Sequence, residues 1–102
     1  MKISVVIKDP GKKPRHVAIE NSLKNLQKTV GGYIEVVRIA SDLAVIVNEE
    51  GLIRDLPYNF NCMGYALYGT AIFVGVNGEE FCDLPLSFRE MKNVFPILWA
   101  EV

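Results

Sequence analysis

The sequence has little of the chemistry on which most enzymes and metal sites depend. Its 102 residues include one histidine, His16, and two cysteines, Cys62 and Cys82. The cysteines form no C-x-x-C pair, and no His or Cys cluster has the spacing of a zinc site. We therefore expect no metal and no cofactor. The glycines make neither a G-x-G-x-x-G nor a Walker-type loop, so nucleotide binding of the usual enzyme kinds is not supported.

An excess of charge of one sign is also missing. Eleven basic side chains face twelve acidic ones, which leaves a formal net charge of −1. Nucleic-acid-binding surfaces usually need a basic stripe or patch, so nucleic acid is not an expected partner. The one basic cluster, Lys8, Lys12, Lys13 and Arg15, flanks the turn Asp9-Pro10-Gly11. Because exposed lysines are the default, we interpret this cluster as a solvated turn.

Long hydrophobic runs are absent as well. No apolar stretch is long enough to span a membrane, so we expect no membrane partner. The apolar stretch Ile3 to Ile7 is too short for a signal peptide, and no cleavage-like site follows it. The expected location is the bacterial or host cytoplasm, where both thiols stay reduced.

What the sequence does have is a mild apolar excess. Half of its residues are hydrophobic, slightly above the usual share. A chain of this length forms one domain, expected to span residues 1–102, with a small core. The excess favours burial of part of the surface in a homo-oligomer, with a dimer as the preferred form.

Two segments have helical spacing. Leu23, Leu26 and Val30 recur at i, i+3 and i+7, which predicts a helix at about 22–30 that covers a sheet and ends at Gly31. Ser87-x-x-Glu90 is a capping box that predicts a second helix at about 87–95. Its apolar stripe is expected to comprise Phe88, Met91, Val94 and Phe95, and Pro96 stops it.

Several segments read as strands because they are rich in β-branched residues and bounded by turn residues. We expect the segments 33–39 and 43–47 to be central strands covered on both faces, because most positions on each face are apolar. Asn77-Gly78 is a tight-turn signal, and 58–68 is expected to be a long loop or irregular element. The expected fold is therefore α+β: a single compact domain with a mainly antiparallel β-sheet of about five to six strands and two short helices. The expected strands are 3–7, 16–20, 33–39, 43–47, 70–76 and 80–83.

The polar residues that usually carry catalysis are better explained as structural here. His16 is expected on an exposed edge hairpin, and Cys82 has acidic neighbours that disfavour a reactive thiolate. The acidic doublets Glu49-Glu50 and Glu79-Glu80 fall at polar turns, where solvated acids normally lie. An enzyme using Cys82 or His16 is the weakest functional hypothesis.

The most informative candidate site is an aromatic segment. Tyr58, Phe60, Tyr65 and Tyr68 lie within eleven residues, with Asn59 among them. Tyrosine is favoured in interfaces because it offers a large area and a polar tip. The segment is therefore either a protein-binding surface or base-stacking pocket, or a lid on the core. The apolar tail from Ile97 to Val102, which contains Trp99, is a second candidate and is expected to dock or to pair as a final strand.

Several segments also resemble a known family. The run Leu26-Gln27-x-x-Val30-Gly31-Gly32-Tyr33-Ile34-Glu35-Val36-Val37 resembles the signature of the small family catalogued as domain of unknown function 3846. The segments Val47–Gly51, Leu56-Pro57-x-Asn59, Gly69–Gly75 and the opening Val5–Pro14 also match, so the resemblance spans most of the chain. It implies a setting in gut bacteria, their phages and mobile elements. It implies no enzyme, because the family has no assigned catalytic residues.

Two functional hypotheses follow. The first is a non-catalytic interaction protein of a phage or mobile element that binds a host protein, such as a defence component, as a homo-oligomer. The second is a small-molecule binder that sequesters a nucleotide signal. It would need tyrosine rings together with a cation for phosphate, and Arg38 or Arg54 are the candidates.

Overall fold

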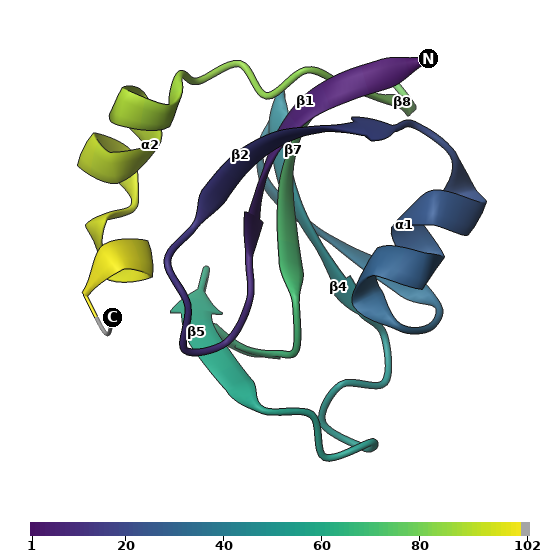
Figure 1. The fold of residues 1–102 in the computed structure, drawn as a ribbon, viewed down its shortest axis with the longest axis vertical. Coiled ribbons are helices and arrows are strands. Elements are labelled where there is room, and N and C mark those ends of the chain that lie inside the picture. The colour runs from purple at the N-terminus through teal and green to yellow at the C-terminus, as the bar shows by residue number, and fades with distance from the viewer. Residues whose placement is uncertain (101–102) are drawn as a thin grey trace.

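The apolar strand segments assemble into one antiparallel sheet in the computed structural model, which describes residues 1–100 (Figure 1). The strands run in the order β2-β1-β7-β4-β3. Strand β8 pairs with the last residues of β7, beyond those that pair with β1. Two helices and a six-stranded, antiparallel sheet confirm the predicted α+β fold. The sheet consists of β1 (Lys2–Lys8), β2 (Arg15–Glu20), β3 (Ile34–Ala40), β4 (Leu43–Asn48), β7 (Ala71–Asn77) and β8 (Glu80–Cys82).

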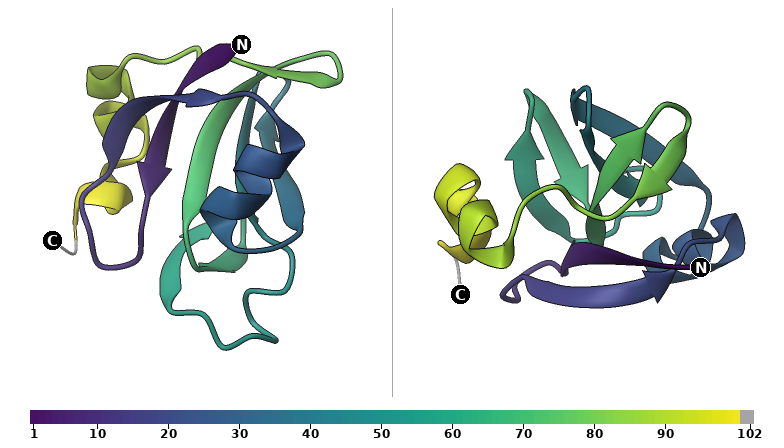
Figure 2. Two further views of the ribbon diagram at one scale, coloured as in Figure 1. Left: turned by 45° about the vertical axis from the view of Figure 1, so that its right-hand side comes forward. Right: turned by 90° about the horizontal axis from the view of Figure 1, so that it is seen from above.

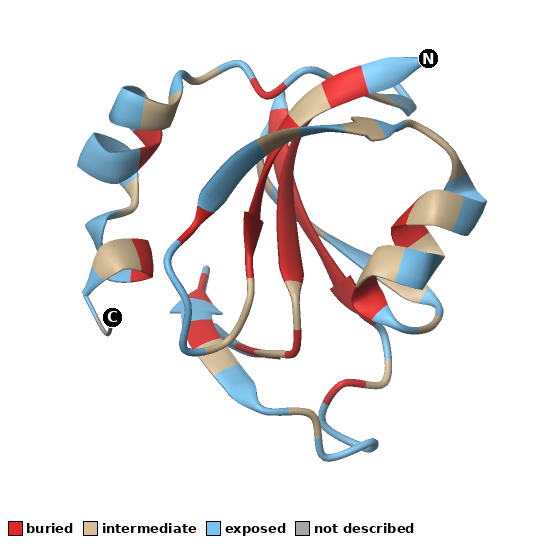
Figure 3. Ribbon diagram, in the orientation of Figure 1, coloured by how far each residue is buried: buried red, intermediate tan, exposed pale blue. Residues whose placement is uncertain are grey.

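Both faces of the sheet are covered, each by a different part of the chain. Helix α1 (Leu23–Val30) covers one face and buries Leu26 and Val30 against it. The hairpin of β5 (Tyr58–Cys62) and β6 (Tyr65–Tyr68) covers the other, together with α2 (Phe88–Val94) and the short 3₁₀ helix η1 (Pro96–Trp99). Figures 1 and 2 show α1 and α2 on opposite sides of the sheet. Burial is accordingly concentrated in β1, β4 and β7 between them (Figure 3).

Strand β3 lies at the edge of the sheet, so the prediction of a covered central strand is wrong for this segment. It pairs with β4 alone, and four of its seven residues are exposed. The same prediction is right for β4, which is buried along its whole length. Both segments have apolar residues on both faces. The difference is that β4 has a paired strand on each side, whereas β3 has one on one side only. This difference depends on the order of the strands.

The segment 58–68 is also more regular than predicted. It forms the two-stranded sheet β5–β6, with Met63 and Gly64 at its turn in the left-handed conformation. The low β-propensity of Asn59, Asn61 and Gly64 hides the strands in the sequence. The hairpin gains its stability by packing on the main sheet.

Three predicted positions differ from the structure in burial. Leu23 and Val94 belong to the apolar stripes predicted for α1 and α2, yet both are more than half exposed. Each helix is short and contacts the sheet over a narrow stripe. Lys8, predicted at a solvated turn, is buried because β1 is an interior strand and continues to this residue.

The apolar tail docks on the sheet, as one of the two predicted alternatives stated. It does so through η1, which buries Leu98 in the core beneath α2. The part of the predicted tail at 101–102 lies outside the described residues. Within residues 1–100, no helix is long and apolar enough to cross a membrane.

Candidate functional site

The outer edge of β3 presents backbone groups without a strand partner. The Glu49 N–H donates to the Tyr33 carbonyl at 2.8 Å, which orients the backbone groups of Tyr33 toward β4. Because these groups alternate in direction along an antiparallel strand, those of Ile34, Val36 and Arg38 point away from β4. An exposed edge of this kind is a ready template for pairing with another strand.

A hollow of about 510 Å³ adjoins this edge on the side of the β5–β6 hairpin. Two large apolar side chains around it are exposed, Met63 by 60% and Tyr65 by 64%, while the Val36 side chain, exposed by 42%, lies on the face of β3 that Ile34 shares. The charged groups Glu35 and Arg38 also line it. A strand added to β3 would therefore contact both open hydrogen-bonding groups and apolar side chains. The lining residues are Glu35, Val36, Val37, Arg38, Met63, Tyr65, Ala66 and Leu67.

The hairpin itself is a core lid on one face and a solvent-facing surface on the other. Phe60, Cys62 and Leu67 point into the core, where the Phe60 ring stacks on Phe73 with centroids 5.8 Å apart. Tyr65 and Tyr58 are exposed. The two alternatives raised by the sequence therefore describe opposite faces of the same hairpin.

Tyr58 and Tyr68 contact each other at the open end of the hairpin. Tyr58 packs edge-on against Tyr68 with centroids 5.8 Å apart, and its hydroxyl donates to Asn61 Oδ1 at 2.9 Å. These contacts fix the Tyr58 ring although it is half exposed. Tyr68 also lines a small hollow of about 120 Å³ beside Gly51 and Leu52.

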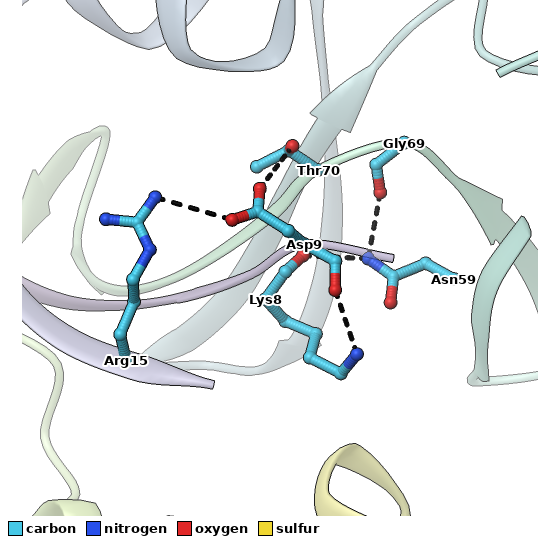
Figure 4. A network of polar contacts seen from close by, with 6 residues as sticks. All are labelled: Lys8, Asp9, Arg15, Asn59, Gly69 and Thr70. Carbon is cyan, nitrogen blue, oxygen red and sulfur yellow. Dashed lines mark hydrogen bonds and ion pairs between the residues drawn. The ribbon is translucent and has the colours of Figure 1, made fainter. Parts of the chain in front are cut away.

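A second hollow, of about 410 Å³, lies where the end of β1 meets β5 and η1. Asn59 anchors it: the side-chain amide donates to the carbonyls of Lys8 and Gly69, both at 2.8 Å. The Lys8 ammonium donates to the Asp9 carbonyl at 2.9 Å. The Asp9 carboxylate accepts the Thr70 hydroxyl at 2.7 Å and pairs with Arg15 at 3.5 Å (Figure 4). This network ties the β1–β2 turn to the hairpin.

Burial lowers the pKa of the Lys8 ammonium because the charged form is desolvated, and the nearby Asp9 charge opposes this effect. The Cys62 thiol also changes, since burial raises its pKa and favours the unreactive protonated form. Burial of the Lys8 ammonium therefore costs desolvation energy. Cys62 behaves as a packed apolar side chain.

Two residues predicted for binding lie apart from the hollows. Arg54 pairs with Glu50, four residues earlier in the chain, at 3.2 Å. It lines none of the three hollows. Trp99 packs edge-on against Phe88 with centroids 5.4 Å apart, and so holds η1 to α2. Arg38 and Tyr65 do line one hollow together, but Glu35 shares it with them.

His16 makes a contact that the sequence did not indicate. Its Nε2 lies 2.5 Å from Ser4 Oγ, and its ring stacks on Phe88 with centroids 6.0 Å apart. Neither Ser4 nor His16 lines any of the three hollows. Over residues 1–100, no carboxylate hydrogen-bonds the imidazole, and no three His, Cys, Asp or Glu side chains cluster as a metal site would require. The contact joins β2 to β1 and α2.

Sequence reasoning missed Lys8, Val36 and Met63 as site residues. A signal for Lys8 was available, because it follows Val6 by two residues and so shares its core-facing side of the strand. Val36 and Met63 gave no such signal. Their exposure depends on the edge position of β3 and on the hairpin turn.

Comparisons with known proteins give one family. The sequence model of the family described as "Domain of unknown function (DUF3846)" matches residues 1–95. The matched range includes the segments that resemble this family, and it extends through the β5–β6 hairpin and α2. No curated protein and no solved structure matches the chain.

Proposed function

The chain belongs to the DUF3846 family, and from this premise we propose that it is a non-catalytic binding protein of a phage or mobile genetic element. It acts as a homo-oligomer, with a dimer as the preferred form. Its target is a host protein, such as a component of a defence system. The observation that carries the proposal is the open edge of β3 beside the hollow that Met63 and Tyr65 line.

Binding at this edge would follow the physics of strand addition. A partner strand gains main-chain hydrogen bonds from Ile34, Val36 and Arg38, while the flanking side chains select the partner. Half of the chain's residues are hydrophobic, and several of the large ones are exposed around β3. The opposite edge strand, β2, exposes Arg15, His16 and Glu20, and no hollow with exposed apolar side chains among residues 1–100 adjoins it.

Hydrogen exchange tests this mode of binding. In an isolated molecule the amides of Ile34, Val36 and Arg38 face solvent and exchange rapidly. We expect protection of the Val36 and Arg38 amides when two copies of the wild-type chain are bound to each other. Rapid exchange of both amides in an assembled complex would contradict pairing at β3.

Capture from a bacterial host lysate tests the partner. Val36→Lys places a charge at the centre of the β3 edge, whereas Ala18→Lys places the same charge at an exposed position on β2. We expect the wild type and Ala18→Lys to retain the same host protein and Val36→Lys to lose it, because the host protein binds through a preformed oligomeric surface. Equal recovery by all three, or no partner for any, would count against the proposal.

A further inference from the structure

The hollow of about 410 Å³ between β1, β5 and η1 brings a buried cation next to an unpaired acceptor. It is lined by Lys8, Gly11, Tyr58, Asn59, Phe60 and Ile97. A concave, mainly apolar wall with a few convergent polar groups is typical of small-molecule sites. This hollow is separate from the β3 edge, and it forms no part of the proposed protein interface.

The orientation of the Asn59 amide is settled by its neighbours. Its nitrogen donates to two carbonyls, Lys8 O and Gly69 O, which accept hydrogen bonds but cannot donate them. A flipped amide would place oxygen against both carbonyls and lose both bonds. The side-chain oxygen must therefore point the other way. It is buried, and no group in residues 1–100 donates to it.

The Lys8 ammonium supplies the complementary charge. The residue is only 4% exposed, and its Nζ makes one hydrogen bond, to the Asp9 carbonyl. An ammonium has three N–H donors, so further donors remain. Among residues 1–100, no carboxylate lines the hollow, and the Asp9 carboxylate is engaged by Thr70 and Arg15. Figure 4 shows the Asn59 oxygen and the Lys8 ammonium on the same side of the network.

We propose that this hollow binds a small organic molecule carrying an oxyanion. The oxyanion accepts from Lys8 Nζ, and the body of the ligand lies against Tyr58 and Ile97. The half-exposed Tyr58 ring, fixed by Tyr68 and Asn61, suits a flat ligand. A metal ion does not fit, since the lining found among residues 1–100 offers the Lys8 cation and no carboxylate, imidazole or thiol.

Phosphate and carboxylate are two sources of the same oxyanion chemistry, and a titration separates them. The full chain, labelled with ¹⁵N, is titrated with inorganic phosphate, with nucleoside monophosphates and with hydroxybenzoate. We expect saturable shifts of the Asn59 side-chain amide and the Gly11 backbone amide with an organic probe. The dissociation constant should be about 1 mM or tighter. The nucleotide arm also tests the nucleotide-binding hypothesis drawn from the sequence.

Two variants of one chemical change provide the matched control. Lys8→Met should weaken binding roughly ten- to hundredfold, which is the usual effect of losing a hydrogen bond to a charged group. Lys12→Met removes the same charge from an exposed position on the turn and should change affinity by less than about twofold. Ile97→Trp keeps Lys8 and fills the rim, so it should also weaken binding even if Lys8→Met is poorly folded.

Three results would overturn the proposal: no saturable shift with any probe, equal weakening by Lys8→Met and Lys12→Met, or full binding by Ile97→Trp. Val36→Lys should leave the titration unchanged, because β3 does not line the hollow. Failure of this site and failure of the β3 interface are therefore separate outcomes.

Discussion

At the scale of single residues, the buried strands include two residues that buried strands normally avoid. Lys8 places an ammonium at the rim of the core with one backbone acceptor. Gly75 interrupts the buried strand β7, although glycine weakens strands. Each position has a local reason. Lys8 lines the hollow between β1, β5 and η1, and Gly75 lies where the chain after β8 crosses it closely.

Replacing the buried cation should stabilise the fold. We expect Lys8→Met to raise the free energy of unfolding at pH 7 by about 1 kcal/mol, because an apolar side chain escapes the desolvation cost. The pKa of Lys8 is lowered in the folded state. Between this lowered pKa and the ordinary pKa of lysine, the unfolded state binds more protons, so the stability of the wild type rises with pH. The advantage of Lys8→Met should therefore shrink toward alkaline pH. Urea unfolding at several pH values measures it, with Lys12→Met as the control.

The backbone at Gly75 should not tolerate a side chain. A Cβ atom there would lie 2.1 Å from the Asp83 carbonyl oxygen and 2.9 Å from Cys82 Sγ. We expect Gly75→Ala to lower the free energy of unfolding by about 3 kcal/mol. Gly78→Ala meets no atom within 4 Å and is strained only by its φ of +66°, so it should cost about 1 kcal/mol. Equal losses would show that the close approach at β8 is unimportant.

At the scale of elements, the β5–β6 hairpin combines packing and exposure through strand alternation. Its inner side chains complete the core, and its outer residues Tyr65 and Met63 form part of the wall of the hollow beside β3. Because successive side chains of a strand point to opposite faces, one short hairpin can do both. The two roles should separate cleanly by mutation.

Truncation of one inner and one outer aromatic residue tests this separation. Phe60→Ala should cost about 3–5 kcal/mol of stability, because it removes a ring stacked on Phe73. Tyr65→Ala should change stability by less than about 0.5 kcal/mol while weakening self-association or partner binding. Thermal unfolding and sedimentation measure the two effects. A destabilising Tyr65→Ala would show that the outer face is part of the core.

The N-terminal cap of α2 provides a second test at the scale of elements. Ser87 Oγ accepts from the Glu90 N–H at 3.1 Å, and the Glu90 carboxylate accepts from the Ser87 N–H at 2.9 Å. These bonds lower the pKa of Glu90, so their contribution to stability is lost as the pH falls through that lowered value. Ser87→Ala should cost about 1 kcal/mol in urea unfolding. The exposed Ser41→Ala should cost little, and equal effects would contradict the capping role.

Features with a local cause were predictable from the sequence, and features set by distant contacts were not. The capping box at Ser87, the end of α1 at Gly31 and the turn at Asn77-Gly78 each depend on a few neighbouring residues. The edge position of β3 depends on β4 and β7, which pair from far along the chain. The tyrosines at 58, 65 and 68 were predictable as a group because they lie close together in the sequence. The hydrogen bond from Asn59 to Lys8 was not, because it joins residues that are far apart in the sequence.

At the scale of the whole molecule, the two edges of the sheet differ in character. Both edges carry charged residues, but the β3 edge also exposes Val36 and adjoins the exposed Met63 and Tyr65 across a hollow. The Lys8 hollow lies near the β1–β2 turn and is not lined by β3. The protein therefore has one surface suited to strand pairing and a separate hollow suited to a small ligand.

The oligomeric mass in solution tests the central claim most directly. Light scattering during size exclusion gives this mass for the wild type, for Val36→Lys and for the control Ala18→Lys. We expect a dimer for the wild type and Ala18→Lys and a monomer for Val36→Lys, with the circular dichroism spectrum unchanged. A monomeric wild type, or a Val36→Lys variant that stays dimeric, would contradict an interface at the β3 edge.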